Sequence, residues 1–211
     1  MQNSNLNLEK EYKTLQRPIN KAIIYEGNGA KPNETKFVRE SASGKLTIVA
    51  VSHPSESLVT AISLVDDGVE LIELCGYIPL TWRARISKAV GHRAKVSSVT
   101  FGIESIGLAA SFSKSYQEGN PPREAYIILE NESDPVRDRF EKIFGFQHTT
   151  FIPVPDETTG AQVAAELAEK GFGLIELYGG FSASGASKVI DAVNGRVSVG
   201  VGSFMFDEIS R

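Results

Sequence analysis

Short apolar runs alternate with longer amphipathic stretches along this chain, and the whole pattern occurs twice. The apolar runs show no regular alternation with polar positions, which is typical of parallel strands whose two faces are both covered by helices. The expected strands are 22–26, 46–51, 69–75 and 95–101 in the first half, and 125–130, 149–154, 172–178 and 197–204 in the second.

The stretches between these strands predict helices. A proline at a plausible first helical position opens the first helix of each half, and Ser133 and Asp134 stand where an N-cap belongs. Glycines follow the second helices at positions suited to a left-handed C-cap. The expected helices run from Pro32 to about Gly44, over 56–67 and up to Val90 in the first half, and from Pro135 to about Gly145, over 159–170 and up to Val193 in the second.

The two halves are copies of one unit. Residues 22–101 align with 125–204 at a constant offset of 103, without a gap, and 20 of the 80 aligned pairs are identical. Ordinary composition predicts about 5 such identities by chance. The run Leu71-Ile72-Glu73-Leu74 recurs as Leu174-Ile175-Glu176-Leu177. The chain therefore arose by internal duplication of a small α/β unit.

Strands that alternate with helices predict βαβ units and a mainly parallel sheet, so the fold class is α/β. Two arrangements satisfy the pattern. The first is a tandem duplication of a four-stranded parallel unit, giving two Rossmann-like lobes as a pseudo-dimer. The second is one small (βα)8-like barrel of two half-barrels, with Ser105–Gln117 as a fourth helix. The two-lobe arrangement is favoured, because 211 residues is near the lower limit for a barrel.

The same pattern divides the chain into four parts. Leu8, Tyr12 and Leu15 stand at helical spacing and predict an N-terminal helical arm. Gly119 and the two prolines that follow it are typical of a linker. The expected parts are the arm over 1–21, the first repeat over 22–118, the linker over 119–124 and the second repeat over 125–211.

Composition narrows the class of partner. The chain is 41% hydrophobic, carries a formal net charge of −4 and shows no polybasic patch, so we expect neither nucleic acid nor a membrane surface as a partner. No apolar run approaches the roughly 18–20 residues of a membrane span, which indicates a cytoplasmic protein. One cysteine, Cys75, and three scattered histidines have no metal-ligand spacing. We expect no metal and no cofactor, and the oligomeric state stays open, a homo-oligomer included.

A glycine-rich turn in the second repeat is the candidate binding site. Gly179-Gly180-Phe181-Ser182-Ala183-Ser184-Gly185 follows an expected strand and precedes a helix. Ligands of parallel α/β folds bind beyond the carboxyl ends of strands, and N–H groups at a helix start favour an anion. The predicted substrate-binding residues are Gly179, Gly180, Ser182, Ser184 and Gly185. The turn matches no nucleotide-binding motif, and its alternative role is a tight connection that needs small residues.

Glu73 and Glu176 are the candidate catalytic residues. Each lies inside an otherwise apolar strand, at equivalent places in the two copies. A buried carboxylate costs several kcal/mol unless it is paired or hydrogen-bonded, and its pKa is often raised, which suits acid–base chemistry. The alternative is that each glutamate only accepts hydrogen bonds from neighbouring backbone N–H groups and fixes a turn.

The two copies differ beside these glutamates. Bulky residues from Tyr77 to Trp82 replace the small residues of the glycine-rich turn, so one functional site per chain is expected. Tyr77 and Trp82 either wall a pocket or pack as core. Gly200 and Gly202 interrupt the last strand, where glycine usually marks a bulge or a close approach of backbone.

The run Ile72-Glu73-Leu74-Cys75-Gly76 and its partner, from Ile175 to Phe181, resemble an uncharacterised bacterial family. Its members are single-unit α/β proteins of about a hundred residues with an I-E-L-C-G-G-F-like motif. This chain is similar to two such units fused, with Tyr178 at the cysteine position of the second copy. The resemblance implies the fold and the position of a site, and no established activity comes with it.

The leading functional hypothesis is that the chain binds a small anionic metabolite at the turn of the second repeat. Glu176, together with Glu73, then acts as acid or base in a reaction of the lyase or isomerase type. The competing hypothesis is a non-catalytic ligand-binding or protein-assembly module in which both glutamates are structural. Convergence of the two glutamates beside an open pocket favours the enzyme, and sealed, fully bonded glutamates favour the module.

Overall fold

The protein is described by a computed structural model that covers residues 17–202. Its first lobe consists of strands, two longer helices and short helical turns. In chain order these are β1 (Lys21–Glu26), α2 (Pro32–Thr35), β2 (Phe37–Ser41), β3 (Gly44–Val51), α3 (Glu56–Asp66), β4 (Leu71–Leu74), α4 (Leu80–Val90), η1 (Gly91–Arg93) and β5 (Lys95–Ser98).

The second lobe repeats this order. A short strand and a long helix, β6 (Thr100–Phe101) and α5 (Ile103–Gln117), connect the two lobes. The remaining elements are β7 (Glu124–Leu129), β8 (Phe140–Phe144), β9 (Gln147–Val154), α6 (Glu157–Glu169), β10 (Leu174–Tyr178), α7 (Ala183–Val193) and β11 (Ser198–Val201).

Each lobe has its own sheet, so the two-lobe prediction is confirmed and the barrel alternative is wrong. The strand order is β2-β3-β1-β4-β5 in the first sheet and β6-β11-β10-β7-β9-β8 in the second. Four neighbouring strands are parallel in each lobe, and β2 and β8 join their neighbours antiparallel. Residues 1–16 of the N-terminal arm predicted over 1–21 lie outside the described residues. So does the end of the last strand, which was predicted to reach Phe204.

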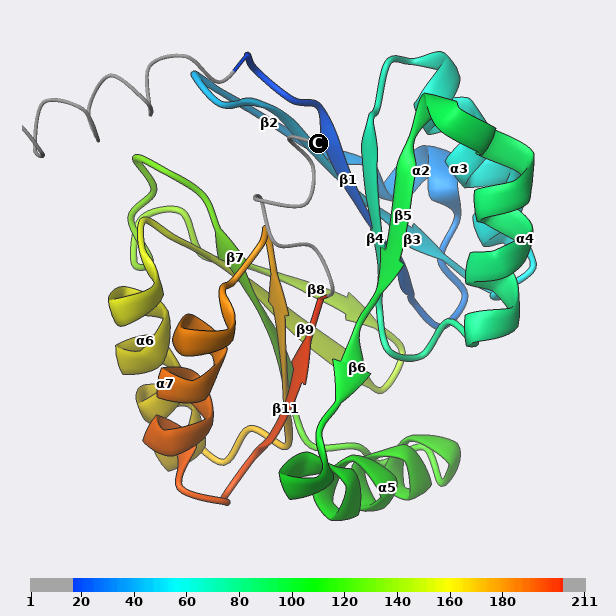
Figure 1. Ribbon diagram of the computed structural model, residues 1–211. Helices are drawn as coiled ribbons and strands as arrows, with labels where there is room; N and C mark the ends of the chain where they lie inside the picture. Colours follow the sequence, from blue (N-terminus) through cyan, green and yellow to red (C-terminus); the bar gives the residue numbers. More distant parts are fainter. Residues whose placement is uncertain (1–16, 203–211) are drawn as a thin grey trace, which may run out of the picture.

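The two sheets pack face to face, with helices on the outside (Figure 1). Helices α3 and α4 cover the outer face of the first sheet, and α6 and α7 cover that of the second. The expectation that helices cover both faces of each sheet is therefore wrong: the inner face of each sheet is covered by the other sheet. An apolar run looks the same in both cases, because either neighbour removes the strand from water.

Aromatic side chains fill the layer between the two sheets, which we call the seam. Tyr25 of β1 lies edge-on against Tyr126 and Phe151, with ring centroids 5.8 and 5.2 Å apart. Phe37 and Phe140, which occupy equivalent positions in the two repeats, lie against each other at a tilt, with ring centroids 4.2 Å apart. Equivalent residues meet in this way only near a twofold axis, so the lobes are related by a pseudo-twofold through the seam.

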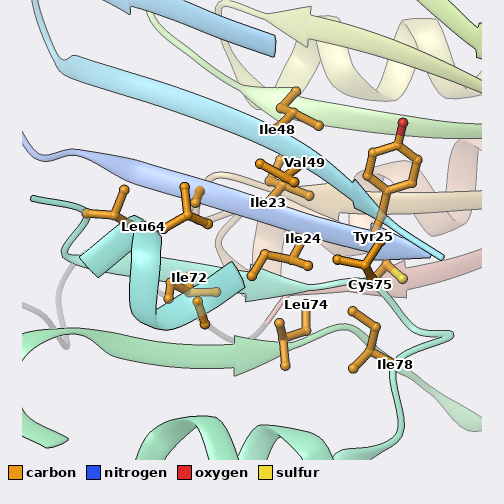
Figure 2. Close-up of a cluster of buried hydrophobic side chains, with 14 of the residues drawn as sticks. Ile23, Ile24, Tyr25, Ile48, Val49, Leu64, Ile72, Leu74, Cys75 and Ile78 are labelled. Atoms are coloured by element: carbon orange, nitrogen blue, oxygen red, sulfur yellow. The ribbon is translucent and has the colours of Figure 1, made fainter. Parts of the chain in front are cut away.

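The core of the first lobe is continuous with this layer. Figure 2 shows Ile24, Ile72 and Leu74 of neighbouring strands gathered near Leu64 of α3, together with Cys75 and Ile78. Burial of each large apolar side chain contributes about 1.5–3 kcal/mol. The inner side chains of both lobes belong to one buried cluster, which indicates that the lobes share a core.

The first helix predicted in each repeat is mostly wrong. Pro32 does begin a helix, but α2 ends at Thr35 and the edge strand β2 follows. In the second repeat Asp134 accepts hydrogen bonds from the N–H groups of Val136 and Arg137, as an N-cap does, and yet a turn leads to β8. Burial alternates residue by residue along both edge strands. That period of two is the signature of a half-buried strand, and it outweighs the capping signal.

The strand predicted over 95–101 is divided between the two sheets. β5 ends at Ser98, and β6 crosses to the second sheet, where Phe101 and Thr100 pair antiparallel with Gly200 and Val201 of β11. Helix α5 then packs against β11, with the Ser105 hydroxyl accepting a hydrogen bond from the Val199 N–H at 3.0 Å. The first repeat thus completes the edge of the second sheet.

We expect Tyr25→Ala to destabilise the protein by about 3–5 kcal/mol, because the truncation leaves a cavity in the shared core. The matched control is Val59→Ala on α3, where the side chain is 71% exposed and the cost should stay within about 0.5 kcal/mol. Urea unfolding measures both values. Equal costs for the two variants would contradict the shared core.

Candidate functional site

Glu73 and Glu176 reach across the seam to each other's lobes. The Gly179 N–H donates to Glu73 Oε2 at 3.0 Å, and the Gly76 N–H donates to Glu176 Oε1 at 2.9 Å. Gly76 and Gly179 are equivalent positions, so the two contacts are the same contact made twice around the pseudo-twofold. Each carboxyl group holds the turn that follows the equivalent strand of the other lobe. The two contacts define two ends of the seam, which we call the Gly179 end and the Gly76 end.

The second oxygens of the two carboxyl groups differ. The Tyr178 hydroxyl donates to Glu176 Oε2, so both oxygens of Glu176 are bonded and the side chain is sealed, at 1% exposure. Within residues 17–202, Oε1 of Glu73 is buried without a hydrogen-bond partner. The difference has a simple source in the sequence, because Cys75 stands in the first repeat where Tyr178 stands in the second.

Burial raises the pKa of both carboxyl groups. The pKa of Glu73 rises to about 7, since the Gly179 hydrogen bond and the charge of Lys21 only partly offset the desolvation. The pKa of Glu176 rises to about 8, where the hydrogen bonds from Tyr178 and Gly76 oppose desolvation and the nearby charge of Glu124 adds to it. Both groups therefore titrate near neutral pH.

Glycine is required at these turns because other side chains lie close to the backbone. A Cβ at Gly76 would lie 2.7 Å from Glu176 Oε1, and one at Gly202 would lie 2.7 Å from Glu73 Oε1. A Cβ at Gly200 would lie 2.5 Å from Val99, beside β6. Gly179 has φ +86°, in the left-handed region. The interruptions of the last strand thus mark places where side chains from the first lobe pass close to its backbone.

The Gly179 end opens into a cleft between the lobes. A recess of about 10 Å³ is lined by Glu73, Lys21 and Gly179, together with residues of the β2–β3 turn and the end of β7. Such a volume is about that of one small group or one water molecule. The recess shares Lys21, Leu129 and other residues with a larger cleft of about 660 Å³, which extends to the N-terminus of α6 and to Lys188.

The glycine-rich turn contributes less to this cleft than the sequence suggested. Of its five predicted binding residues, only Gly179 lines the recess, and none of the others lines the recess or the cleft. The Ser182 N–H and hydroxyl donate to the carboxylate of Glu157 at 2.6 and 3.0 Å, and the Gly185 N–H donates to Ser182 Oγ at 3.0 Å. A carboxylate of the chain itself thus occupies the helix start that we had assigned to an anion.

The remaining residues of the turn have structural positions. Gly180 has φ +90°, which favours glycine, and Ser184 is exposed on the first turn of α7. Gly185 packs against Glu157, whose carboxyl carbon lies 2.2 Å from the place a Cβ would take. A tight turn that needs small residues, the alternative role, accounts for these three positions.

At the Gly76 end the side chain of Gln147 fills the seam. Gln147, which is 2% exposed, donates through Nε2 to Glu124 Oε1 at 2.8 Å and to the Glu26 carbonyl at 2.9 Å. Its Oε1 accepts hydrogen bonds from the Asn28 N–H and from the Tyr116 hydroxyl, both at 3.3 Å. The position that Gln147 fills is the equivalent of Gly44, beside the open recess.

Aromatic side chains complete the closure of the Gly76 end. Tyr77 stacks on Tyr116 of α5 with ring centroids 4.3 Å apart, and Phe112 of α5 lies against Tyr77 at 6.3 Å. Trp82 lies under the guanidinium of Arg85, 4.5 Å from the ring centroid. Neither Tyr77 nor Trp82 lines the recess or the cleft. The two ends of the seam are therefore unequal, in line with a single site in each chain.

Sequence reasoning missed three residues of this region. Lys21 and Glu124 occupy equivalent places at the start of the first strand of each repeat, and Gln147 opens β9. The signal was present for Glu124, which is 1% exposed and is, like Glu176, a carboxyl group in an apolar strand. Burial raises the pKa of Glu124, while hydrogen bonds from Thr149 and Gln147 act against that rise.

The geometry defines a class: a tandem two-lobe α/β protein with a shared core and a cleft between the lobes. The chain belongs to DUF6506, a family of unknown function, which matches residues 19–114 and again residues 122–211. Two matches in tandem confirm the duplication, with one family unit in each repeat.

Similarity to characterised proteins is slight. A solved carbohydrate transporter from Acidothermus cellulolyticus 11B, in complex with myo-inositol, is 15% identical with a TM-score of 0.30, over 87% of this chain and 73% of that chain. A likeness of this size carries no argument about fold or ligand. No curated protein matches the chain.

Within residues 17–202, no helix has the length and apolar character needed to cross a membrane. The same residues hold no group of three or more histidine, cysteine, aspartate or glutamate side chains arranged to bind a metal ion.

We expect Glu176→Gln to reduce the dependence of stability on pH. The folded-state pKa of Glu176 lies above its ordinary value of 4.5, so its stabilising contribution is complete below about pH 4.5 and is lost as the pH rises through about 8. The amide keeps an acceptor for the Gly76 N–H and carries no charge. From about pH 5 to about pH 9, the decrease in the free energy of unfolding should be at least about 1 kcal/mol smaller in the variant than in the wild type.

Glu169→Gln, at an exposed position at the end of α6, is the matched control and should follow the wild-type curve. Urea unfolding at a series of pH values provides the measurement. A Glu176→Gln curve with the same pH dependence as the wild type would show that this carboxyl group is not desolvated as described.

Proposed function

We propose that the chain binds a small metabolite in the cleft at the Gly179 end and that Glu73 exchanges a proton with it. The observation that carries the proposal is the contrast between two equivalent carboxyl groups. Glu176 is bonded at both oxygens, whereas Glu73, which lines the recess, is bonded at one and has a second, buried oxygen without a partner among residues 17–202. The proposed reaction is acid–base chemistry of the lyase or isomerase type.

The size of the cleft supports this proposal. Sites for small molecules usually measure about 300–1,000 Å³, and the cleft of about 660 Å³ falls within that range. It lies beyond the carboxyl ends of β7 and β9, which is where ligands bind in parallel α/β sheets. The narrow recess at its inner end brings a bound group toward Glu73.

The charges of the cleft are mixed. Arg17, Lys21 and Lys188 line it together with four carboxylates, Glu130, Glu132, Asp156 and Glu157. The walls as a whole therefore do not attract an anion, and the binding of an anionic group depends on the local surroundings of the recess.

Glu73 has the properties of a general acid or base. A pKa of about 7 lets one carboxyl group give and take a proton at physiological pH, and the hydrogen bond from Gly179 fixes one oxygen while the other has no partner among residues 17–202. Glu176, with both oxygens bonded, serves in this proposal as a positioning residue that holds the Gly76 turn.

Binding can be tested with thermal shifts of the purified protein against carboxylates, sugar phosphates and polyols. A ligand at 100 times its dissociation constant adds about 2.7 kcal/mol of stability. We expect Ala42→Trp, at the cleft wall, to abolish the shift and the matched Ala110→Trp, on the exposed face of α5, to preserve it. A ligand that shifts wild type and Ala42→Trp alike would place binding elsewhere.

Catalysis can be tested with the same ligands by following solvent deuterium exchange with NMR. Glu73→Gln should keep binding and slow proton exchange by about 10²- to 10⁴-fold, while Glu176→Gln should leave the exchange rate within a few-fold of the wild type. Binding without exchange in the wild type would instead support the second candidate function, a non-catalytic binding module. The sealed carboxyl group of Glu176 is the observation that favours that alternative.

A further inference from the structure

We propose that residues 203–204 pair antiparallel with the open edge of β5, as β6 pairs with β11, and so complete the first sheet. These two residues follow the end of β11 and lie outside the described residues. The basis of the pairing is the internal duplication, together with an edge of the first sheet that has no partner strand among residues 17–202. The pairing is independent of the proposed binding function.

The two sheets differ by one strand. The second sheet has six strands and the first has five, and the additional strand is β6, which the first repeat contributes. At the corresponding edge of the first sheet, β5 is the last strand within residues 17–202 (Figure 1). The edge of a sheet is a template for a further strand, because its backbone groups lack partners. By the offset of 103, the residues equivalent to β6 are Ser203 and Phe204.

The chain follows the same path in both repeats up to the point where the first repeat crosses to the other sheet. The Val99 N–H donates to the Leu74 carbonyl at 2.9 Å, and β6 begins at the next residue. The equivalent Gly202 N–H donates to the Leu177 carbonyl, also at 2.9 Å. The second repeat therefore reaches the same point of departure, on the opposite side of the pseudo-twofold axis.

The backbone of β5 presents groups to the open edge. The Lys95 and Val99 N–H groups donate to the carbonyls of Glu70 and Leu74, on the side of β4. Since backbone groups alternate in direction along a strand, those of Ser98 point away from β4, to the open edge. A strand at this edge would pair with Ser98.

The register of β6 identifies the partner of Ser98. In the second sheet Thr100 pairs with Val201, and the offset of 103 converts this pair into Ser98 and Ser203. Ser98 is 1% exposed, and its hydroxyl has no hydrogen-bond partner among residues 17–202. A buried hydroxyl without a partner is costly, and hydroxyls directly opposite on neighbouring strands bond to each other. A serine at position 203 supplies that partner.

The side chains at the crossing compensate for each other between the repeats. A Cβ at Gly200 would lie 2.5 Å from Val99, so this pair has room for one side chain only. The equivalent pair is Ser97 and Gly202, in which the side chain belongs to the other member. Glu73 Oε1 takes part of the space beside Gly202. Each repeat thus keeps a glycine where the two crossing segments come close.

Charge complementarity extends the contact beyond the paired residues. At the edge of the second sheet, the Val199 N–H donates to Ser105 Oγ at 3.0 Å. The offset of 103 converts this contact into Val96 with Glu208. The Arg83 guanidinium already lies at that edge, where its Nε donates to the Val96 carbonyl at 3.2 Å. A carboxylate at position 208 would therefore lie close to a cation, which favours this path for the chain.

The pairing places Phe204 beside the Gly179 end. In the first repeat Phe101 lies 2.9 Å from the place that a Cβ of Gly76 would take. The equivalent residues are Phe204 and Gly179. The segment would thus cover the turn whose N–H donates to Glu73.

A disulfide between the two strands tests the pairing in the full chain, with Cys75→Ala to remove the native thiol. Directly opposite residues of antiparallel strands have Cα atoms about 4.5–5.5 Å apart, which suits a disulfide. We expect Ser98→Cys with Ser203→Cys to form an intramolecular disulfide on mild oxidation, detected by mass spectrometry after digestion. The matched control is Val38→Cys with Ser203→Cys, which moves one thiol to β2 at the opposite edge of the sheet and should form none.

Three outcomes of this experiment would overturn the proposal. The first is the absence of the intramolecular disulfide, and the second is an equal yield in the control. The third is a covalent dimer joined through the Ser98→Cys positions of two chains, since it would show that a second copy occupies the edge of β5.

Hydrogen exchange followed by NMR gives a second test without a crosslink. Ser203→Pro removes the N–H that would donate to the Ser98 carbonyl, and it should speed exchange of the Ser98 N–H at least about tenfold. Ser210→Pro, beyond the paired residues, should leave that rate within a factor of about two. The same Ser98 exchange rate in the wild type and in Ser203→Pro would contradict the pairing.

Discussion

Two apolar sheets that face each other leave no water for the polar groups trapped between them, and this constraint organises the protein. Glu73 of the first lobe and Glu176 of the second lie in the seam, and each accepts a hydrogen bond from a backbone N–H of the other lobe. A buried carboxyl group without such a donor costs several kcal/mol, so the bonds favour one register of the two lobes over others. The contact between Phe37 and Phe140 marks the axis around which this register is set.

The duplication made the two ends of the seam equivalent, and a few substitutions made them different. Gln147 and Tyr116 fill one end, while at the other end Gly44 packs against the Ile19 backbone and lines the recess beside the cleft. Function, on this view, is confined to the end where the second oxygen of the carboxyl group lacks a partner, and stability to the end where both oxygens are bonded.

Much of this fold follows from local sequence. The repeat, the parallel strands and the helices α3, α4, α6 and α7 are readable from apolar runs and glycine caps. Glu73 and Glu176 stand out because charge in an apolar strand must be compensated. The face-to-face packing of the sheets cannot be predicted from the sequence, because a strand buried by a sheet and one buried by a helix have the same composition. Gln147 bonds to the Asn28 N–H across 119 residues, and no local pattern reveals such a pairing.

A shared core requires that the two lobes form one cooperative unit through the seam. The most direct measurement is urea unfolding followed by two signals on the same samples. Trp82, the single tryptophan, reports on the first lobe through its fluorescence, and far-ultraviolet circular dichroism reports on both lobes. A shared core predicts coincident transitions with one midpoint and one slope. A fluorescence transition that is complete while half of the dichroism signal remains would show that the lobes unfold separately and would contradict the account.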